Sequence, residues 1–159
     1  MPTRKDILDW EMSCDFGWGL LGYNIFCQWA NDASIAPVSG RLITEERLGL
    51  TDPLRLSALA SAIQESNEYL RSVAPIVPKP VEVDADVIVP VSHGFAPSIF
   101  KGTHNIGRCI FANTELSGLT DQLERCDVLL CASRWNADLL RAATGREVSV
   151  IHEWIDHRR

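Results

Sequence analysis

The sequence contains no Cys-x-x-Cys pair, and its five cysteines are scattered through apolar segments: Cys14, Cys27, Cys109, Cys126 and Cys131. An odd number of scattered cysteines argues against a disulfide framework and against a structural zinc site. The histidines His104, His152 and His157 show no metal-ligand spacing with one another or with the cysteines. We therefore expect a reducing, cytoplasmic compartment and no metal held by the protein.

Basic clusters and long apolar runs are also lacking. The 159-residue chain has 15 Lys and Arg against 21 Asp and Glu, a net charge of −6, and no basic cluster longer than a pair such as Arg158-Arg159. This balance argues against a nucleic-acid partner or an anionic membrane surface. No stretch approaches the roughly 18 apolar residues of a membrane span, and no signal-peptide core is visible. We expect a protein with no transmembrane segment.

Residues 127–156 form the most regular part of the sequence. Residues 128–131 are a short apolar run, Ser133 can cap a following helix, and Gly145 stands where a left-handed helix terminus is favoured. Residues 148–151 add a β-branched run. This compact strand-helix-strand unit predicts a right-handed crossover between parallel strands.

The rest of the chain extends the alternation of strands and helices. Asp52-Pro53 predicts a helix start, with a capping carboxylate and a proline in the first turn. We predict strands at 10–16, 34–38, 87–91 and 106–111, helices at 20–31, 53–71 and 120–125, loop or a helical turn at 41–50 and 95–104, and a rigid proline-containing connector at 73–80. The order predicts one α/β domain over residues 1–159, Rossmann-like, with a parallel sheet and helices on both faces.

In such sheets ligands bind beyond the carboxyl ends of the strands. Gly17, His93, Glu115 and Ser133 each follow a predicted strand, and we expect them at one rim. His93 would be a general base or a sugar-hydroxyl partner, against the alternative of a hydrogen-bonded structural residue. Glu115 would bind hydroxyls or cap a turn, whereas Ser133 fits a helix cap better than a nucleophile. The tryptophans Trp18, Trp29 and Trp135 favour packing over a stacking platform.

The sequence Gly17-x-Gly19-x-x-Gly22 formally matches the dinucleotide-binding fingerprint. The predicted strand before it carries Glu11, Ser13 and Asp15, and the acidic residue expected about 20 positions later is absent. Two interpretations remain open. Either the glycines let a ligand approach the amides of a helix amino terminus, or they form a tight turn.

Several segments together resemble the amino-terminal half of GT-B glycosyltransferases, particularly the family-four-like retaining enzymes. The resemblance covers most of the chain from Phe16 onward. It rests on Gly17-Trp18-Gly19, His93-Gly94, Asn105-Ile106-Gly107, Glu115-Leu116, the segment 131–136 (CASRWN) and the segment 150–156 (VIHEWID). The last two segments are the most specific. The family has glycine where Trp154 stands, which implies an altered approach to the interdomain linker.

The resemblance implies that Gly17, Trp18 and Gly19 line the acceptor cleft, that His93 faces the transferred sugar or the acceptor, and that Glu115 holds the acceptor side. It also implies a second, donor-binding domain beyond Arg159. The chain would then be the acceptor-binding half of a hexosyltransferase, truncated and inactive alone. It would bind no cofactor itself, and a separate domain or partner chain would supply the site for the nucleotide-sugar donor. Its exposed rim would offer a surface for self-association.

Two further functions are compatible with the same residues. One is a non-catalytic α/β binding or interaction module that kept the fold without the chemistry. The other is a dinucleotide-binding oxidoreductase, which rests on the glycine pattern alone.

Overall fold

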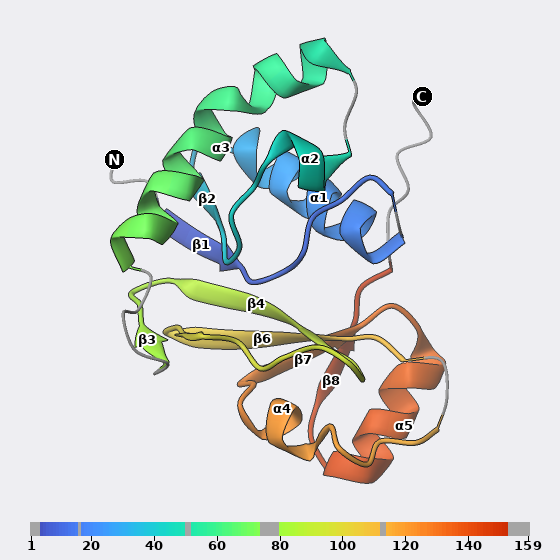
Figure 1. Ribbon diagram of the computed structural model, residues 1–159. Coiled ribbons are helices and arrows are strands. Elements are labelled where there is room, and N and C mark those ends of the chain that lie inside the picture. The colour runs from blue at the N-terminus through green and yellow to red at the C-terminus, as the bar shows by residue number, and fades with distance from the viewer. Residues whose placement is uncertain (1–3, 16, 50–51, 74–79, 112–113, 153–159) are drawn as a thin grey trace. The chain divides into compact units, whose positions relative to one another are not determined.

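The computed structural model describes residues 4–15, 17–49, 52–73, 80–111 and 114–152. The fold is α/β, with a six-stranded parallel sheet flanked by helices, which confirms the predicted fold class. Contacts divide the chain into two compact units, Met1–Ile88 with Ser98–Thr103, and Val89–Pro97 with His104–Arg159. Figure 1 labels most of the elements of both units. The prediction of one domain over residues 1–159 stays a prediction.

The first unit contains three strands of the sheet. β1 (Arg4–Leu8) pairs in parallel with β2 (Ile35–Ser39) on one side and with residues 86–88 of β4 (Asp86–Val91) on the other. The helices α1 (Gly17–Ala30) and α3 (Pro53–Val73) pack against β2, and the short α2 (Glu45–Leu48) precedes α3. Ile7, Leu8 and Val87 are fully buried and form the centre of this unit.

The first predicted strand, residues 10–16, is wrong. The strand lies earlier, at β1, and the described residues 10–15 form a loop that packs on α1. The alternation arises because Trp10 and Met12 are buried while Glu11 is exposed. The true strand was hidden by its three charged residues, Arg4-Lys5-Asp6, of which Asp6 is buried and accepts hydrogen bonds from Arg4 at 3.1 and 2.7 Å.

Other elements of the first unit match their predictions more closely. β2 and α3 are confirmed, and Asp52 caps α3 by accepting the backbone N–H of Leu54 at 3.0 Å. The connector at 73–80 lies largely outside the described residues. A two-stranded parallel pair was missed, β3 (Val81–Glu82) with β5 (Phe100–Lys101), because two residues are too few to show a periodicity.

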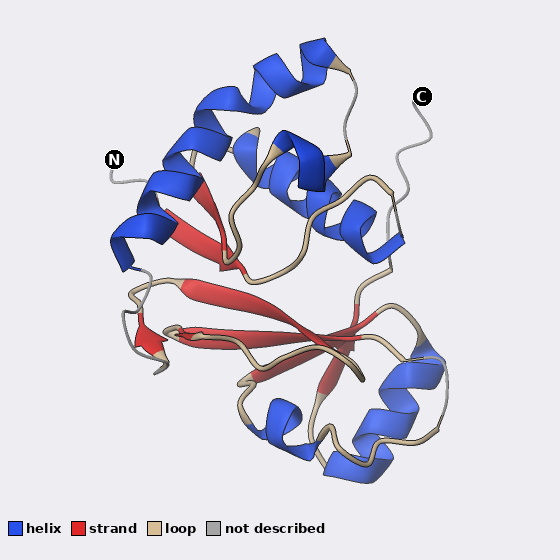
Figure 2. Ribbon diagram, viewed as in Figure 1, coloured by secondary structure: helices blue, strands red, loops and turns tan. Residues whose placement is uncertain are grey.

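The second unit holds the remainder of β4, then β6 (His104–Cys109), α4 (Thr120–Glu124), β7 (Val128–Cys131), α5 (Arg134–Thr144) and β8 (Val148–Val150). β6, β7 and β8 pair in parallel, with Cys109 beside Cys131 and Cys131 beside Val150. Figure 2 shows these strands with α4 and α5. The strand-helix-strand prediction for 128–151 is confirmed.

The cap residues of α5 are also confirmed. The Ser133 hydroxyl accepts the backbone N–H of Asn136 at 3.1 Å, and Gly145 ends the helix with a φ of 67°. Ala137 and Leu140 on this helix are fully buried in one apolar cluster, which also contains Val91, Phe111, Leu119 and Leu129. The cluster places the loops after β4, β6 and β7 over one core.

Candidate functional site

The turn that follows β4 fixes the position of His93. β4 ends at Val91, and the N–H of Phe95 donates to the carbonyl of Ser92 at 3.4 Å. Gly94 has a φ of 86°, a conformation that only glycine adopts without strain. The Gln122 amide, from α4, donates to the Phe95 carbonyl at 3.2 Å. His93 is therefore an exposed side chain on an anchored turn.

Glu115 and Ser117 form a second turn in the loop between β6 and α4. A Glu115 carboxylate oxygen accepts the backbone N–H of Ser117 at 2.8 Å. Leu116 between them packs against the apolar cluster, and the N–H of Leu119 donates to its carbonyl at 3.1 Å. The carboxylate is thus held by its own loop and remains exposed.

The two turns meet at Ser117. Nε2 of His93 lies 3.1 Å from the carbonyl oxygen of Ser117, although the two residues are 24 positions apart. Because a carbonyl oxygen only accepts, this contact places the imidazole proton on Nε2 when the ring is neutral. Nδ1 is then left as an acceptor, with no hydrogen bond to any residue that the structure describes.

The electrostatics keep Glu115 ionised. The hydrogen bond from the Ser117 side chain lowers the pKa of the Glu115 carboxyl, the backbone N–H of Ser117 lowers it further, and His93 adds a smaller contribution. The site therefore presents a carboxylate and an imidazole nitrogen that both accept hydrogen bonds. Its complement is a neutral ligand that donates several hydrogen bonds, such as a polyhydroxyl compound.

The structure joins His93 to Glu115 through Ser117, and it corrects the surroundings of Gly17, Trp18 and Gly19. These residues belong to the first turn of α1 and do not follow a strand, since β1 ends at Leu8. The Trp18 carbonyl accepts a hydrogen bond from Nε1 of Trp10 at 2.9 Å. Gly17, Trp18 and Gly19 lie in the first unit and His93 and Glu115 in the second, so the prediction that all five share one cleft stays a prediction.

The dinucleotide interpretation loses its structural basis with this correction. Gly19 and Gly22 lie inside α1, where a Cβ on Gly19 would come within 2.7 Å of the Ser13 backbone and a Cβ on Gly22 within 2.8 Å of the Trp10 ring. The glycines therefore let the loop at 10–13 lie against the helix. The tight-turn alternative is wrong as well, because the pattern is helical.

Two residues of the site were missed by sequence reasoning. Ser117 joins His93 to Glu115, and Gln122 holds the turn after β4. The Glu-x-Ser spacing at 115–117 is a local signal of a side-chain-capped turn. The contact between Ser117 and His93 has no such signal, because it joins segments far apart in the sequence.

The cysteines do not offer a reactive thiolate in the described structure. All five are free. Burial raises the pKa of the Cys109 thiol to about 12 and that of Cys126 to about 11. Among the residues that the structure describes, no group of three or more His, Cys, Asp and Glu could hold a metal ion.

An open groove of about 420 Å³ in the first unit is a cavity of ligand size. It runs between α2 and α3 and is lined by residues such as Leu48, Ile63, Gln64 and Asn67. The Asn67 amide is engaged with both backbone groups of Ile43, at 2.9 and 2.8 Å, and the Gln64 amide donates to Glu68 at 2.9 Å. The Asn67 amide is therefore engaged at both its oxygen and its nitrogen.

No protein-family model, no curated protein and no solved structure matches this chain. None of the helices in the described ranges is both long and apolar enough to cross a membrane. The segment 153–156, which carries part of the resemblance to glycosyltransferases together with Trp154, lies outside the described residues.

Proposed function

We propose that this chain is the acceptor-binding half of a nucleotide-sugar-dependent glycosyltransferase that transfers a hexosyl group. The observation that carries the proposal is the pairing of His93 and Glu115 through Ser117 beyond the carboxyl end of β4. Two acceptor groups held side by side suit the hydroxyl groups of a sugar. The α/β fold and the segments at 93–94, 115–116 and 131–136 are compatible with the same proposal.

The two side chains have separate roles in this proposal. Glu115, kept ionised by Ser117, accepts hydrogen bonds from acceptor hydroxyls. His93 accepts through Nδ1 and faces the transferred sugar, so it is the candidate catalytic residue of this half. Gly17, Trp18 and Gly19 of the first unit would also bind the acceptor, as the resemblance implies. The nucleotide-sugar donor would be held by a separate domain or a partner chain.

The proposal predicts that the chain binds saccharides and that binding depends on both His93 and Glu115. We would measure dissociation constants by saturation-transfer NMR and calorimetry with maltotriose, mannotriose and chitotriose, for the wild-type chain and for His93→Ala and Glu115→Gln. A hydrogen bond to a charged group contributes about 1.5–3 kcal/mol, so Glu115→Gln should weaken binding by roughly tenfold or more.

Glu124→Gln is the matched control, because Glu124 is another exposed carboxylate of the same unit at the end of α4. It should leave the dissociation constant unchanged. Thermal unfolding would verify that every variant folds. If no saccharide binds, or if binding is indifferent to both His93 and Glu115, the assignment of an acceptor site is wrong.

A non-catalytic saccharide-binding module is the second candidate function. The arrangement of His93, Ser117 and Glu115 favours this candidate, because ligand binding alone accounts for it without a chemical reaction. One experiment separates the two functions. The chain is saturated with a saccharide, and a nucleotide sugar and the donor-binding domain or partner chain are added. A glycosylated saccharide supports the glycosyltransferase half, and its absence supports the binding module.

A further inference from the structure

The side chain of Trp135 is 50% exposed, which is unusual for so large an aromatic group. It is the second residue of α5, directly after the turn that follows β7. The sequence favours packing for this residue, and in the structure about half of it is packed. One part of the ring packs, and the other part is open to solvent.

The packed part of the ring lies against Phe111. The centroids of Trp135 and Phe111 lie 6.5 Å apart with an interplanar angle of 56°, a tilted aromatic pair. Phe111 is 9% exposed and belongs to the apolar cluster of the second unit. The Asn136 amide donates to the Phe111 carbonyl at 3.4 Å, and Ser133 caps the first turn of α5. The exposed part of the Trp135 ring therefore lies on a pre-organised support.

The support of Trp135 is also the support of the His93–Glu115 site. The apolar cluster contains Val91, two residues before His93, and Phe111, which contacts Trp135. Leu116, between Glu115 and Ser117, packs against the same cluster. Within one unit, the carboxyl ends of parallel strands precede His93, Glu115 and Trp135. Ligands bind at this edge in such sheets.

The chemistry of an exposed indole complements that of the two acceptors. Its π face carries partial negative charge and attracts the partially positive C–H groups on the flat side of a pyranose ring. Hydroxyl groups radiate from the edge of the same ring, where acceptors can bind them. An acyclic polyol has the hydroxyls but lacks the rigid C–H face.

We propose that Trp135 is a stacking platform for a pyranose ring of the acceptor, so that the acceptor is a saccharide with an accessible C–H face. The inference rests on the proposed function, because it takes His93 and Glu115 as the partners of the hydroxyl groups. It makes the substrate class more specific by excluding acyclic polyols and simple alcohols.

The test combines two variants of one residue with two classes of ligand. Trp135→Phe keeps an aromatic face, and Trp135→Leu keeps an apolar side chain without one. Chain labelled with 5-fluorotryptophan reports on ligand contact by fluorine NMR, and the Trp135 signal is the one absent from Trp135→Phe. The probes are maltotriose, mannotriose, chitotriose and the acyclic polyol sorbitol.

We expect a saccharide to shift the Trp135 signal and sorbitol to leave it in place. Trp135→Leu should weaken saccharide binding by about tenfold, as expected for loss of an aromatic contact, and Trp135→Phe should weaken it less. Leu54→Ala is the control, because Leu54 is 81% exposed on α3 in the other unit. It should not change the affinity. Because half of Trp135 is exposed, both variants are expected to fold, and thermal unfolding would check this.

The outcomes separate this inference from the proposed function. If saccharide binding depends on His93 and Glu115 but Trp135→Leu binds as tightly as wild type, the stacking inference is overturned and the acceptor site stands. If binding depends on Trp135 alone, the stacking inference is supported and the assignment of His93 and Glu115 as partners of the hydroxyl groups is wrong. If no saccharide binds, or if the Trp135 signal responds only to protein concentration, as it would in self-association, the stacking inference is overturned.

Discussion

Two glycines in the first turn of α1, Gly17 and Gly19, differ in whether packing leaves room for a side chain. A Cβ on Gly19 would lie 2.7 Å from the backbone nitrogen and oxygen of Ser13, atoms that cannot move aside without shifting the loop. A Cβ on Gly17 would meet nothing within 4 Å. The absence of a side chain at Gly19 is therefore required by packing, whereas at Gly17 it is not.

Gly19→Ala should destabilise the protein, and Gly17→Ala should not. Overpacking costs about 1–3 kcal/mol, and the upper part of this range, expected for a clash with backbone atoms, exceeds the roughly 1 kcal/mol that alanine gains over glycine in a helix. Gly17→Ala keeps that gain without a clash and should be neutral or stabilising. Urea unfolding of both variants measures the difference. Equal free energies of unfolding would contradict the packing role of Gly19.

The residues of the candidate site could be predicted only in part. His93 and Glu115 were identified because each follows a strand, and the sequence supplies that information locally. The bond between His93 and Ser117 joins positions 24 residues apart, and no periodicity encodes it. The role of Gly17-x-Gly19-x-x-Gly22 was misassigned because the pattern does not reveal that its partners are Trp10 and Ser13.

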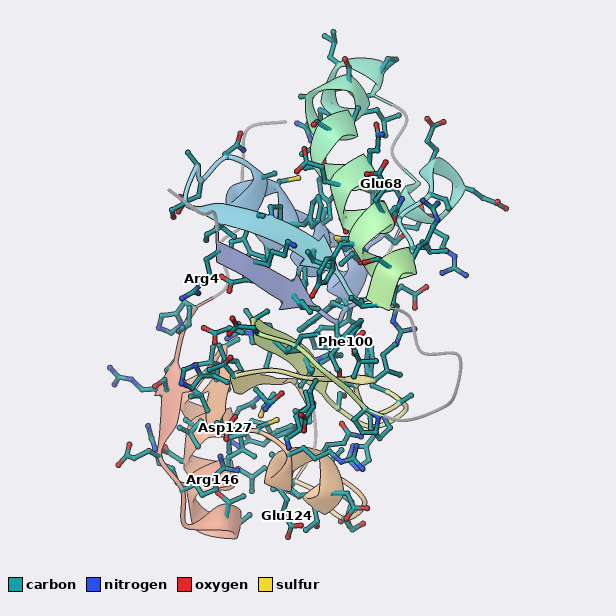
Figure 3. The ribbon with its side chains drawn as sticks, turned by 90° about the vertical axis from the view of Figure 1, so that its left-hand side faces the viewer. Arg4, Glu68, Phe100, Glu124, Asp127 and Arg146 are labelled. Carbon is teal, nitrogen blue, oxygen red and sulfur yellow. The ribbon has the colours of Figure 1, made fainter. Side chains whose placement is uncertain are left out.

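At the scale of elements, a hydrogen-bond network fixes the entry into β7. Arg146, after α5, donates to the carbonyls of Leu123 at 2.7 Å and Asp127 at 3.1 Å, and also to that of Cys126. The Asp127 carboxylate accepts the backbone N–H and the side-chain amide of Asn105 at 2.7 and 3.1 Å. The network ties the start of β6 to the start of β7, and Figure 3 labels Asp127 and Arg146.

The Asp127 carboxylate makes the stability of this network pH-dependent. The backbone N–H of Asn105 lowers the pKa of Asp127 in the folded state, and the Asn105 side chain lowers it further. A pKa below the unfolded value of about 3.9 means that the stabilisation is present above that pH and is lost as the pH falls through the folded pKa. Because the group is exposed, its contribution at pH 7 should be about 0.5–1 kcal/mol.

Asp127→Asn should therefore be less stable than wild type at pH 7, and the gap should close as the pH falls from about 5 to 2. Urea unfolding at a series of pH values measures it. Glu124→Gln is the control, because Glu124 has no hydrogen bond to a described residue, and this variant should follow the wild-type curve. A gap of constant size from pH 7 to pH 2 would show that the Asp127 charge does not act through Asn105.

The elements with complete local signals were predicted well, and β1 was not. α3 has its aspartate cap and proline start, and α5 has serine and glycine at its ends, so both could be placed from the sequence. β1 was missed because three of its five residues are charged, including Asp6, which is only 2% exposed and is bonded to Arg4. That bond compensates locally for the charge, and a hydrophobic pattern cannot reveal it.

At the scale of the whole molecule, the charge of the chain bears on which substrate it can bind. The net charge of −6 repels an anionic nucleotide sugar and does not oppose a neutral saccharide. Sugar transfer needs cationic or hydrogen-bond-donating groups that stabilise the developing charge on the departing diphosphate. The candidate site offers acceptors, Glu115 and Nδ1 of His93, which are the wrong groups for that task.

The purified chain should accordingly bind saccharides and fail to transfer sugar by itself. Incubation with UDP-glucose or GDP-mannose and maltotriose should give no glycosylated product by mass spectrometry, and calorimetry should detect no nucleotide-sugar binding. The control is the same chain with maltotriose alone, which should bind through His93 and Glu115. Sustained turnover of either nucleotide sugar by the chain would contradict the proposal that a separate domain or chain binds the donor. This chain would then hold acceptor and donor together.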